Sequence, residues 1–338
     1  MQLRSEQEII NSWKYIDKVY ISAVCMTYNQ EQYIKTAINS FLQQECDYKF
    51  EIIIHDDAST DTTTEIIKEY AENYPSIVRL IQQVDNKYSQ KPTLPTLIAL
   101  EQTKAEYIAL CEGDDYWIST NKLQCQYLAM QEHKSLCISF HSSQNIYLNG
   151  SFQVGVSLGD LNKVCSLSTV IRGGGAYMPT ASLMFKKELL ASFNQVLANA
   201  PVGDFYMQVL SSSPNGALYI AGLESAYRKQ SEGSWSATTN LFSESEILEL
   251  LDKHEIAIAE LSGFLPLSHQ KDLEYALIHE YYVGARKALF SKNYMLFQRL
   301  IGRCKYSKQK FGITYTIFCC LSYFPKYLLK AYLLVVKR

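Results

Sequence analysis

Carboxylate side chains follow two short apolar segments of the sequence. Asp56 and Asp57 come directly after residues 50–55, which include three consecutive isoleucines, and Glu112-Gly113-Asp114-Asp115 follows residues 107–111. Carboxylates that are held close together repel one another unless a cation or a hydrogen-bonding ligand compensates their charge. Mg²⁺ and Mn²⁺ prefer oxygen ligands and normally also bind the phosphates of a substrate. The pattern therefore predicts a site where a metal ion bridges to a nucleotide diphosphate.

The elements expected around these carboxylates alternate between strand and helix. Apolar segments at residues 19–26, 50–55, 77–81 and 107–111 predict buried strands. Helices are expected between them, over residues 30–44, between residues 61 and 75, and around residues 97–104, from apolar residues at helical spacing and from the break at Pro75. This alternation predicts a parallel sheet with right-handed crossovers.

Three segments should meet at one edge of that sheet, because ligands bind beyond the carboxyl ends of parallel strands. Thr27-Tyr28-Asn29 follows the first expected strand, Asp56-Asp57 the second, and Glu112-Gly113-Asp114-Asp115 the fourth. For Asp56 and Asp115 the alternative is that they cap the following turn or helix through local hydrogen bonds.

The composition excludes several other classes of protein. The chain has 338 residues, of which 47% are hydrophobic and 20% charged, so it can form a packed core and about two domains. Its 32 basic and 34 acidic side chains leave a net charge of -2, which provides no overall positive field for nucleic acid. Nine scattered cysteines without CxxC spacing indicate a reducing compartment. The first residues, MQLRSEQEIINSW, lack the apolar region of a secretory signal, which predicts a cytoplasmic protein.

The segments CMTYNQEQYIKTAINSFLQQ, HDDASTD and EYIALCEGDDYW, in this order and each at an expected strand end, resemble the start of a family 2 glycosyltransferase. The resemblance covers roughly residues 18–240. It implies the α/β fold called GT-A, in which helices flank a Rossmann-like, mostly parallel central sheet. The catalytic, nucleotide-sugar-binding domain would then be residues 1–240, followed by a helical C-terminal region of residues 241–338.

The resemblance also implies roles for individual residues. Asp114 would be the ligand of a Mn²⁺ or Mg²⁺ ion, with Asp115 as the neighbouring candidate, while Thr27, Tyr28 and Asp57 would line the base and ribose. The whole set expected to bind the donor is Thr27, Tyr28, Asn29, Asp56, Asp57, Glu112, Gly113, Arg228, Lys229 and Trp235. The family commonly has Asp where this chain has Glu112, and the extra methylene makes a direct ribose or metal contact less certain there.

Asp204 is the expected catalytic base. It stands at the start of an apolar helical stripe, so the residues alone favour a helix cap. The family carries an acidic base at this place, and a carboxylate here would accept the proton of an acceptor hydroxyl.

The segment AYRKQSEGSWS, residues 226–236, resembles the family's flexible loop over the donor diphosphate. Arg228, Lys229 and Trp235 would close on the charge and the sugar. The alternative for Arg228 is a surface side chain whose stem packs on Tyr227. Many relatives have a histidine where this chain has Gln230, so metal binding by this loop is not expected.

The C-terminal hundred residues show helical apolar stripes over residues 243–303. Residues 311–325 carry no charge, and lysines alternate with apolar residues after them. This uncharged run is shorter than a membrane-spanning helix needs and Pro325 interrupts its continuation, so an interfacial helix with tyrosines and lysines at headgroup level is expected over residues 311–338. The tyrosines in question are Tyr315, Tyr323, Tyr327 and Tyr332. A buried terminal helix or an oligomer contact is the alternative.

Together these features predict an inverting, metal-dependent glycosyltransferase of the hexosyltransferase type. The expected donor is a UDP-sugar, and the expected acceptor is a hydroxyl of a glycan or lipid-linked saccharide, as in bacterial capsule, O-antigen or exopolysaccharide assembly. One alternative is an inactive relative that binds glycans or acts as a membrane scaffold, which Glu112 and Gln230 suggest. A sugar nucleotidyltransferase ranks lower, because no glycine-rich, basic triphosphate loop stands near the first strand.

Overall fold

The computed structural model describes residues 3–229, 242–305 and 312–336. The chain divides into two compact units, Met1–Ser231 and Glu232–Arg338. The domain boundary that we expect near residue 240 lies in a segment outside the described residues.

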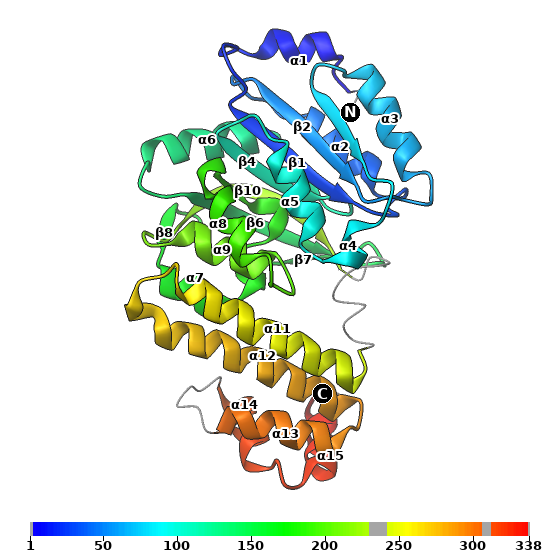
Figure 1. Ribbon diagram of the computed structural model, residues 1–338. Helices are drawn as coiled ribbons and strands as arrows, with labels where there is room; N and C mark the ends of the chain where they lie inside the picture. Colours follow the sequence, from blue (N-terminus) through cyan, green and yellow to red (C-terminus); the bar gives the residue numbers. More distant parts are fainter. Residues whose placement is uncertain (1–2, 230–241, 306–311, 337–338) are drawn as a thin grey trace. The chain divides into compact units, whose positions relative to one another are not determined.

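Unit 1 is an α/β unit built on a ten-stranded sheet (Figure 1). The order is β3-β2-β1-β4-β9-β6-β10-β5, with β7 paired to β6 and β8 paired to β10. The strands are β1 (Ile21–Thr27), β2 (Phe50–Asp56), β3 (Val78–Gln82), β4 (Tyr107–Glu112), β5 (Tyr116–Trp117), β6 (Ile138–Ile146), β7 (Phe152–Val154), β8 (Lys163–Cys165), β9 (Met184–Lys186) and β10 (Ala217–Arg228).

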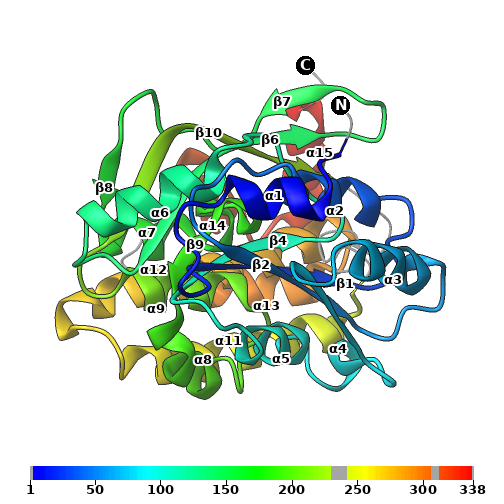
Figure 2. The same cartoon turned by 90° about the horizontal axis from the view of Figure 1, so that it is seen from above.

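Helices flank this sheet, as Figures 1 and 2 show. They are α1 (Glu6–Ser12), α2 (Ile34–Leu42), α3 (Thr63–Asn73), α4 (Lys87–Gln90), α5 (Leu94–Glu101), α6 (Lys122–Glu132), α7 (Leu167–Gly173), α8 (Leu190–Val196) and α9 (Asp204–Ser212), with short 3-10 helices at Gly175–Tyr177, Thr180–Ser182 and Lys187–Leu189.

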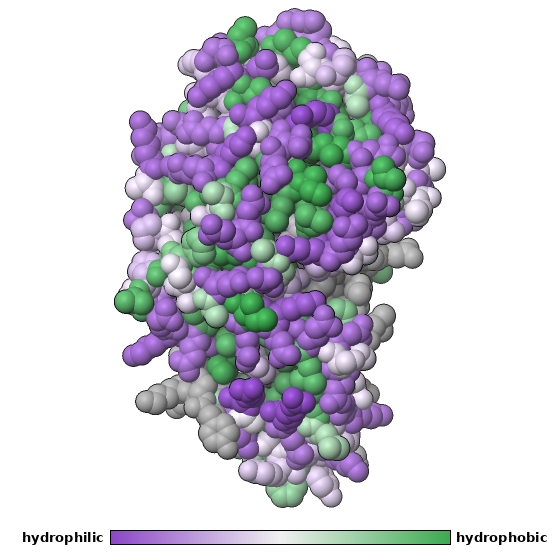
Figure 3. Space-filling model, in the orientation of Figure 1, coloured by the Kyte–Doolittle hydropathy of each residue, from purple (hydrophilic) through white to green (hydrophobic). Residues whose placement is uncertain are grey.

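The four expected strands at the start of the chain are β1, β2, β3 and β4, and they pair in parallel. Side chains of β1, β2 and β4 are buried on both faces, which explains their nearly continuous apolar sequences. The apolar stripe of α2, with Ile34, Ala37, Ile38 and Phe41, is buried in the same core. Hydrophilic residues cover most of the face of the molecule drawn in Figure 3.

The sheet must curl, because only three residues link β4 to β5. β4 lies in the middle of the strand order, whereas β5 lies at its end and pairs antiparallel with β10, Tyr116 opposite Ala226 and Trp117 opposite Ser225. The Trp117 ring packs on Phe41 of α2 with 4.6 Å between ring centroids. The curl therefore brings the end of β10 beside the residues that follow β4.

Two polar segments belong to strands of the sheet. Residues 142–146 continue β6, which is paired with β10 on one side and β7 on the other. Residues 226–228, expected in a flexible loop, are the last residues of β10. Pairing on both edges lets a polar sequence remain in a strand.

Unit 2 is helical. Its elements are α11 (Glu244–Ser262), a 3-10 helix at Leu267–His269, α12 (Gln270–Phe290), α13 (Tyr294–Lys305), α14 (Ile313–Cys320) and α15 (Pro325–Val336). Pro325 begins α15, where its missing N–H costs nothing.

The C-terminal helices α14 and α15 contribute to the core of unit 2. Tyr315 is buried and packs against Tyr282 at 5.3 Å between ring centroids, so it does not lie at the surface position expected for it. Tyr323 and Tyr327 are 76% and 73% exposed. Among the described residues, the search for helices long and apolar enough to cross a membrane finds none.

Candidate functional site

The carboxyl ends of β1, β2 and β4 bring the three predicted segments together. Thr27 pairs with Asp56, and Met26 pairs with Glu112. The Asp57 N–H donates to the Thr27 carbonyl at 3.0 Å, and the Gly113 N–H donates to the Met26 carbonyl at 2.9 Å. The edge at which ligands bind in parallel sheets is therefore lined by the residues that the sequence singles out.

Gly113 is required by a close approach of backbone to side chain. A Cβ at this position would lie 2.8 Å from the Thr27 side chain and would also meet Gln30. A larger residue would therefore push the end of β4 away from β1.

The loops after β1 and β2 are joined by hydrogen bonds, and we call residues 27–31 and 59–63 the loop pair. Asn29 has a φ of 51°, in the left-handed region that Asn tolerates better than most residues. Its Oδ1 accepts from the Thr60 N–H at 2.8 Å, and its own N–H donates to Ser59 Oγ at 2.9 Å. The Glu31 carboxylate accepts from the Thr62 N–H at 3.0 Å. Asn29 therefore has a clear local structural role.

Asp56 and Asp57 also have local hydrogen-bond donors. Asp56 is fully buried and accepts from the Ser59 N–H and from the Thr64 hydroxyl. Asp57 accepts from the backbone N–H groups of Lys87 at 2.7 Å and Tyr88 at 2.8 Å, at the start of α4. Both carboxylates thus act on the turns and helices that follow, and Asp57 holds α4 at the edge of the sheet.

Four other carboxylates form a second group, which we call the carboxylate cluster: Glu112, Asp114, Asp115 and Asp204. Burial, followed by the charges of Asp204, Asp114 and Asp115, raises the pKa of Glu112 well above its usual value. Burial and then the charge of Asp114 raise the pKa of Asp115. These interactions show that the cluster is electrostatically unfavourable when fully ionised.

Asp204 joins the cluster from the first turn of α9. The N-cap position is Gly203, so Asp204 stands one residue inside the helix and makes no side-chain cap. Burial raises the pKa of Asp204 to about 6. A carboxyl group with such a pKa changes its protonation near neutral pH, as a general base requires.

The donor set of the cluster suits a hard divalent cation, because Mg²⁺ and Mn²⁺ prefer carboxylate oxygens. A cation would also reduce the repulsion that raises the pKa values of Glu112 and Asp115. Within the described ranges, however, no three His, Cys, Asp or Glu side chains are arranged as a metal site.

Arg228 fixes the segment that carries Asp114 and Asp115. Its backbone N–H donates to Asp115 Oδ1 at 2.8 Å, and its guanidinium donates to the Asp114 carbonyl. The guanidinium carbon lies 5.0 Å from the ring centroid of Tyr33 and 4.9 Å from that of Tyr116. Arg228 therefore packs on the rings of Tyr33 and Tyr116. The alternative was a surface side chain whose stem packs on Tyr227.

Lys229 also lies near the cluster, with its ammonium 4.1 Å from the ring centroid of Tyr227. Burial lowers the pKa of Lys229, while the charge of Asp115 opposes that shift. Trp235 is also predicted in the loop over the donor diphosphate. Trp235 and Gln230 both lie outside the described residues.

Two tyrosines near the cluster were missed by the sequence reasoning. Burial raises the pKa of Tyr227, and the charges of Glu112, Asp115, Asp204 and Asp114 add to the shift. Burial and the charges of Glu112 and Asp204 likewise raise the pKa of Tyr88. Tyr88 follows a polar segment that contains no motif. Its position at the sheet edge is apparent only from the structure, in which its N–H donates to Asp57.

Comparison with known proteins gives a consistent assignment. The family described as Glycosyl transferase family 2 matches residues 22–150. An uncharacterised protein of Mycobacterium tuberculosis is 31% identical over 215 residues, 64% of this chain and 60% of that protein. WfaP of Escherichia coli, a UDP-Glc:alpha-D-GlcNAc-diphosphoundecaprenol beta-1,3-glucosyltransferase, is 32% identical over 162 residues, 45% of this chain and 59% of WfaP. The chain thus spans about 60% of the length of these relatives.

Two solved structures show the same fold. The crystal structure of TarS from Staphylococcus aureus has a TM-score of 0.61 at 16% identity and covers 92% of this chain and 53% of TarS. The mannosyltransferase PcManGT from Pyrobaculum calidifontis, in complex with GDP-Man and Mn²⁺, has a TM-score of 0.57 at 12% identity and covers 98% of this chain and 94% of PcManGT. Residues 22–150 of the chain thus match glycosyl transferase family 2, and the chain has the GT-A fold.

Proposed function

We propose that the protein is an inverting glycosyltransferase that moves a sugar from a UDP-sugar to a hydroxyl group of a glycan or lipid-linked saccharide. The observation that supports this proposal most directly is the carboxylate cluster, in which the charge of Asp204 acts on Glu112 at the end of β4. A base and a group of potential metal ligands are thus held at the ligand-binding edge of the sheet.

The donor would lie along the carboxyl ends of β1 and β2. Thr27, Tyr28 and Asp57 would line the base and ribose. Asn29 and Asp56 would hold the loops that carry them, and Gly113 would let the end of β4 lie close to Thr27. TarS has been solved in complex with UDP-GlcNAc, and the name of WfaP includes UDP-Glc, which supports a UDP-sugar.

Asp114 and Asp115, with Glu112 beside them, would hold Mn²⁺ or Mg²⁺ near the diphosphate. When bound, the metal ion would stabilise the negative charge of the leaving diphosphate. Arg228 keeps this segment in place, and Lys229 contributes positive charge nearby.

Asp204 would act on the acceptor. Its carboxylate would accept the proton of the acceptor hydroxyl while that oxygen forms a bond to the anomeric carbon and the bond from that carbon to the UDP oxygen breaks. Attack from the side opposite the diphosphate inverts the anomeric centre, and UDP leaves with both electrons of the broken bond.

The assay that tests this proposal is a screen of nucleotide sugars with the full chain, measuring nucleotide release with and without Mn²⁺ or Mg²⁺. We expect metal-dependent release of UDP from one UDP-sugar, and loss of that release in Asp114→Ala. Pyrophosphate release from a nucleoside triphosphate would instead indicate a nucleotidyltransferase. Metal-dependent UDP binding without any turnover would indicate an inactive relative.

We further propose that the protein works in the cytoplasm, in capsule or O-antigen assembly, and contacts the membrane peripherally through residues 311–338. Exposed apolar side chains on α14, on α15 and in the turn between them support this: Ile313, Ile317, Leu321, Tyr323, Phe324 and Tyr327. Exposed aromatic and apolar groups beside lysines are typical of membrane interfaces.

Co-sedimentation with phosphatidylglycerol vesicles tests this contact. The double variant Tyr323→Ser, Tyr327→Ser changes two exposed side chains and keeps the buried Tyr315, whereas deleting residues 311–338 would remove part of the core of unit 2. We expect the double variant to sediment less with the vesicles, and the exposed-site control Ile16→Ser in unit 1 to behave as wild type. Equal sedimentation of all three proteins would contradict the contact.

A further inference from the structure

The β6–β7 hairpin continues the functional edge of the sheet. β6 pairs in parallel with the last residues of β10, and β7 returns antiparallel beside β6. The Lys229 N–H donates to the Ile146 carbonyl at 2.8 Å, so the hairpin starts where β10 ends. The segment from Tyr147 to Val154 is therefore attached next to Tyr227, Arg228 and Lys229.

The strand register places three polar side chains in one row. Tyr227 of β10 pairs with Asn145 of β6, and Asn145 pairs with Gln153 of β7. Paired residues of neighbouring strands direct their side chains to the same face, and adjacent residues of a strand direct them to opposite faces. Tyr227, Asn145 and Gln153 thus share a face, which we call the polar row.

The opposite face carries a different set. Arg228 pairs with Ile146, and Ile146 pairs with Phe152. Phe152 and Val154 are 61% and 76% exposed on that face. The β7 side chains on this face are therefore apolar and exposed, whereas Gln153 on the other face is polar.

The polar row begins at the carboxylate cluster. The N–H of Arg228, the residue after Tyr227, donates to Asp115 Oδ1 at 2.8 Å, so this end of β10 lies beside the cluster. Burial raises the pKa of Tyr227, and the charges of Glu112, Asp115, Asp204 and Asp114 add to that shift. From Tyr227 the row crosses Asn145 and ends at Gln153, on the hairpin. The row therefore leads from the residues beside the carboxylate cluster to the hairpin along one face of the sheet.

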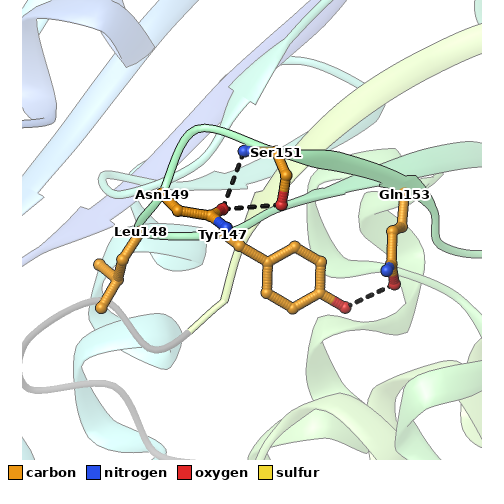
Figure 4. A pocket seen from close by; sticks show the side chains of 5 residues that line it. All are labelled: Tyr147, Leu148, Asn149, Ser151 and Gln153. Carbon is orange, nitrogen blue, oxygen red and sulfur yellow. Dashed lines mark hydrogen bonds between the residues drawn. The ribbon is translucent and has the colours of Figure 1, made fainter.

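A pocket of about 460 Å³ lies at the outer end of the row, lined by Tyr147, Leu148, Asn149, Ser151 and Gln153 (Figure 4). The Tyr147 hydroxyl donates to Gln153 Oε1 at 2.9 Å, which fixes the ring beside the amide. Asn149 Oδ1 accepts from the N–H and the hydroxyl of Ser151 at 3.0 and 2.7 Å. These bonds use the amide oxygens of Asn149 and Gln153, whose amide nitrogens are hydrogen-bond donors.

We propose that the polar row and this pocket bind the saccharide part of the acceptor, two or more sugar units beyond the hydroxyl that reacts. This inference rests on the proposed function and adds the place and chemistry of acceptor binding. Amides and hydroxyls match the hydroxyl groups of a sugar, and the Tyr147 ring matches its apolar C–H face. No side chain that lines the pocket is charged, so the ligand is a neutral saccharide and not a phosphate group.

Saturation-transfer NMR on the full chain tests the proposal, with chitotriose and cellotriose as probes. We expect at least one trisaccharide to bind the wild-type protein. Its Kd should rise about tenfold in Asn145→Ser, Gln153→Ala, which removes two amide groups. The matched control is Phe152→Ala, Val154→Ala, which changes the opposite face of the same hairpin and should leave the Kd unchanged.

Calorimetric titration with UDP and Mn²⁺ separates this inference from the proposed function. Both hairpin variants should bind UDP as the wild type does, which also shows that they are folded. If UDP binds and neither trisaccharide does at millimolar concentration, or if Asn145→Ser, Gln153→Ala binds the probe as wild type does, the acceptor inference is wrong and the proposed function stands. If the wild-type protein binds no UDP, the proposed function itself fails.

Discussion

The loop pair and the carboxylate cluster lie at the same edge of the sheet, yet the surroundings of their acidic groups differ. In and beside the loop pair, Asp56 and Asp57 receive hydrogen bonds from backbone N–H groups and a hydroxyl. In the cluster, Asp115 is buried and Glu112 is half-buried, and loss of solvent together with the charges of neighbouring carboxylates raises the pKa of both. The first region is complete without a ligand, whereas the second gains stability when a cation or a proton arrives.

This difference suggests that the two regions have different functions. A region whose polar groups are already paired is rigid and can present a fixed shape to a base and ribose. A region whose charges repel one another binds a cation with extra free energy, because the cation relieves the repulsion. We therefore expect changes in the cluster to affect chemistry and metal use, and changes at the loop pair to affect stability.

The largest effect should come from Asp204→Asn. The amide cannot accept the acceptor proton, so the kcat of sugar transfer should fall by about 10²- to 10⁴-fold with little change in the KM for donor. The measurement is steady-state UDP release with acceptor present. Asp160→Asn, at an exposed loop position of unit 1, serves as the control and should keep wild-type kcat. A wild-type kcat in Asp204→Asn would remove Asp204 from the mechanism.

The next largest effect should be on metal use. Asp114→Asn should raise the Mn²⁺ concentration for half-maximal activity at least about tenfold, because a carboxylate ligand becomes neutral. The measurement is a Mn²⁺ titration of transfer, supported by calorimetric titration of Mn²⁺ in the presence of UDP. The exposed Asp252 of unit 2 provides the control, Asp252→Asn. An unchanged Mn²⁺ requirement in both assays would contradict the metal role.

The pH profile should show Asp204 directly. Burial raises the pKa of Asp204 to about 6, so the protonated, inactive form is favoured below that pH. The base must be ionised, so kcat/KM should rise about tenfold per pH unit below pH 6 and level off above it. Saturating Mn²⁺ should shift the midpoint down, because a cation favours ionised carboxylates. A profile that is flat through pH 6 at low Mn²⁺ would argue against this assignment.

The smallest effect on activity should come from removing the Thr64 hydroxyl, which donates to Asp56. Its main effect should be on stability. Thr64→Val keeps the shape of the side chain but leaves the buried carboxylate without one donor, so the free energy of unfolding should fall by about 1–3 kcal/mol. Urea denaturation measures this. Thr62→Val removes a similar bond to Glu31 at an exposed position and should cost less. Equal losses in the two variants would show that burial of Asp56 is not the cause.

Much of the fold follows from local sequence patterns. The apolar runs of β1, β2 and β4 are visible in the sequence, and their parallel pairing brings Thr27, Asp56 and Glu112 to one edge. The contact of Arg228 with Asp114 and Asp115 is different, because it depends on the curl of the sheet and joins residues more than a hundred positions apart. No local pattern encodes such a contact, and none marks Tyr88 or the extension of β6 through its polar residues.

The predicted roles of the site residues remain to be tested. What the structure adds is which of them have other partners: Asp56, Asp57 and Asn29 hold local structure, and Arg228 holds the neighbouring acidic segment. The expected strand ends and the family resemblance mark these residues, but neither distinguishes a carboxylate that accepts local hydrogen bonds from one that lies among other carboxylates.

The short link between β4 and β5 sets a limit on how this sequence can vary in length. Gly113, Asp114 and Asp115 are the whole connection between the middle of the sheet and its last strand. Because side chains alternate along a strand, one inserted residue would shift the register of β5 against β10 and turn Trp117 out of the core. The length of the acidic segment therefore sets the register of β5, in addition to supplying candidate ligands. An insertion there should lower the stability of the fold as well as the activity.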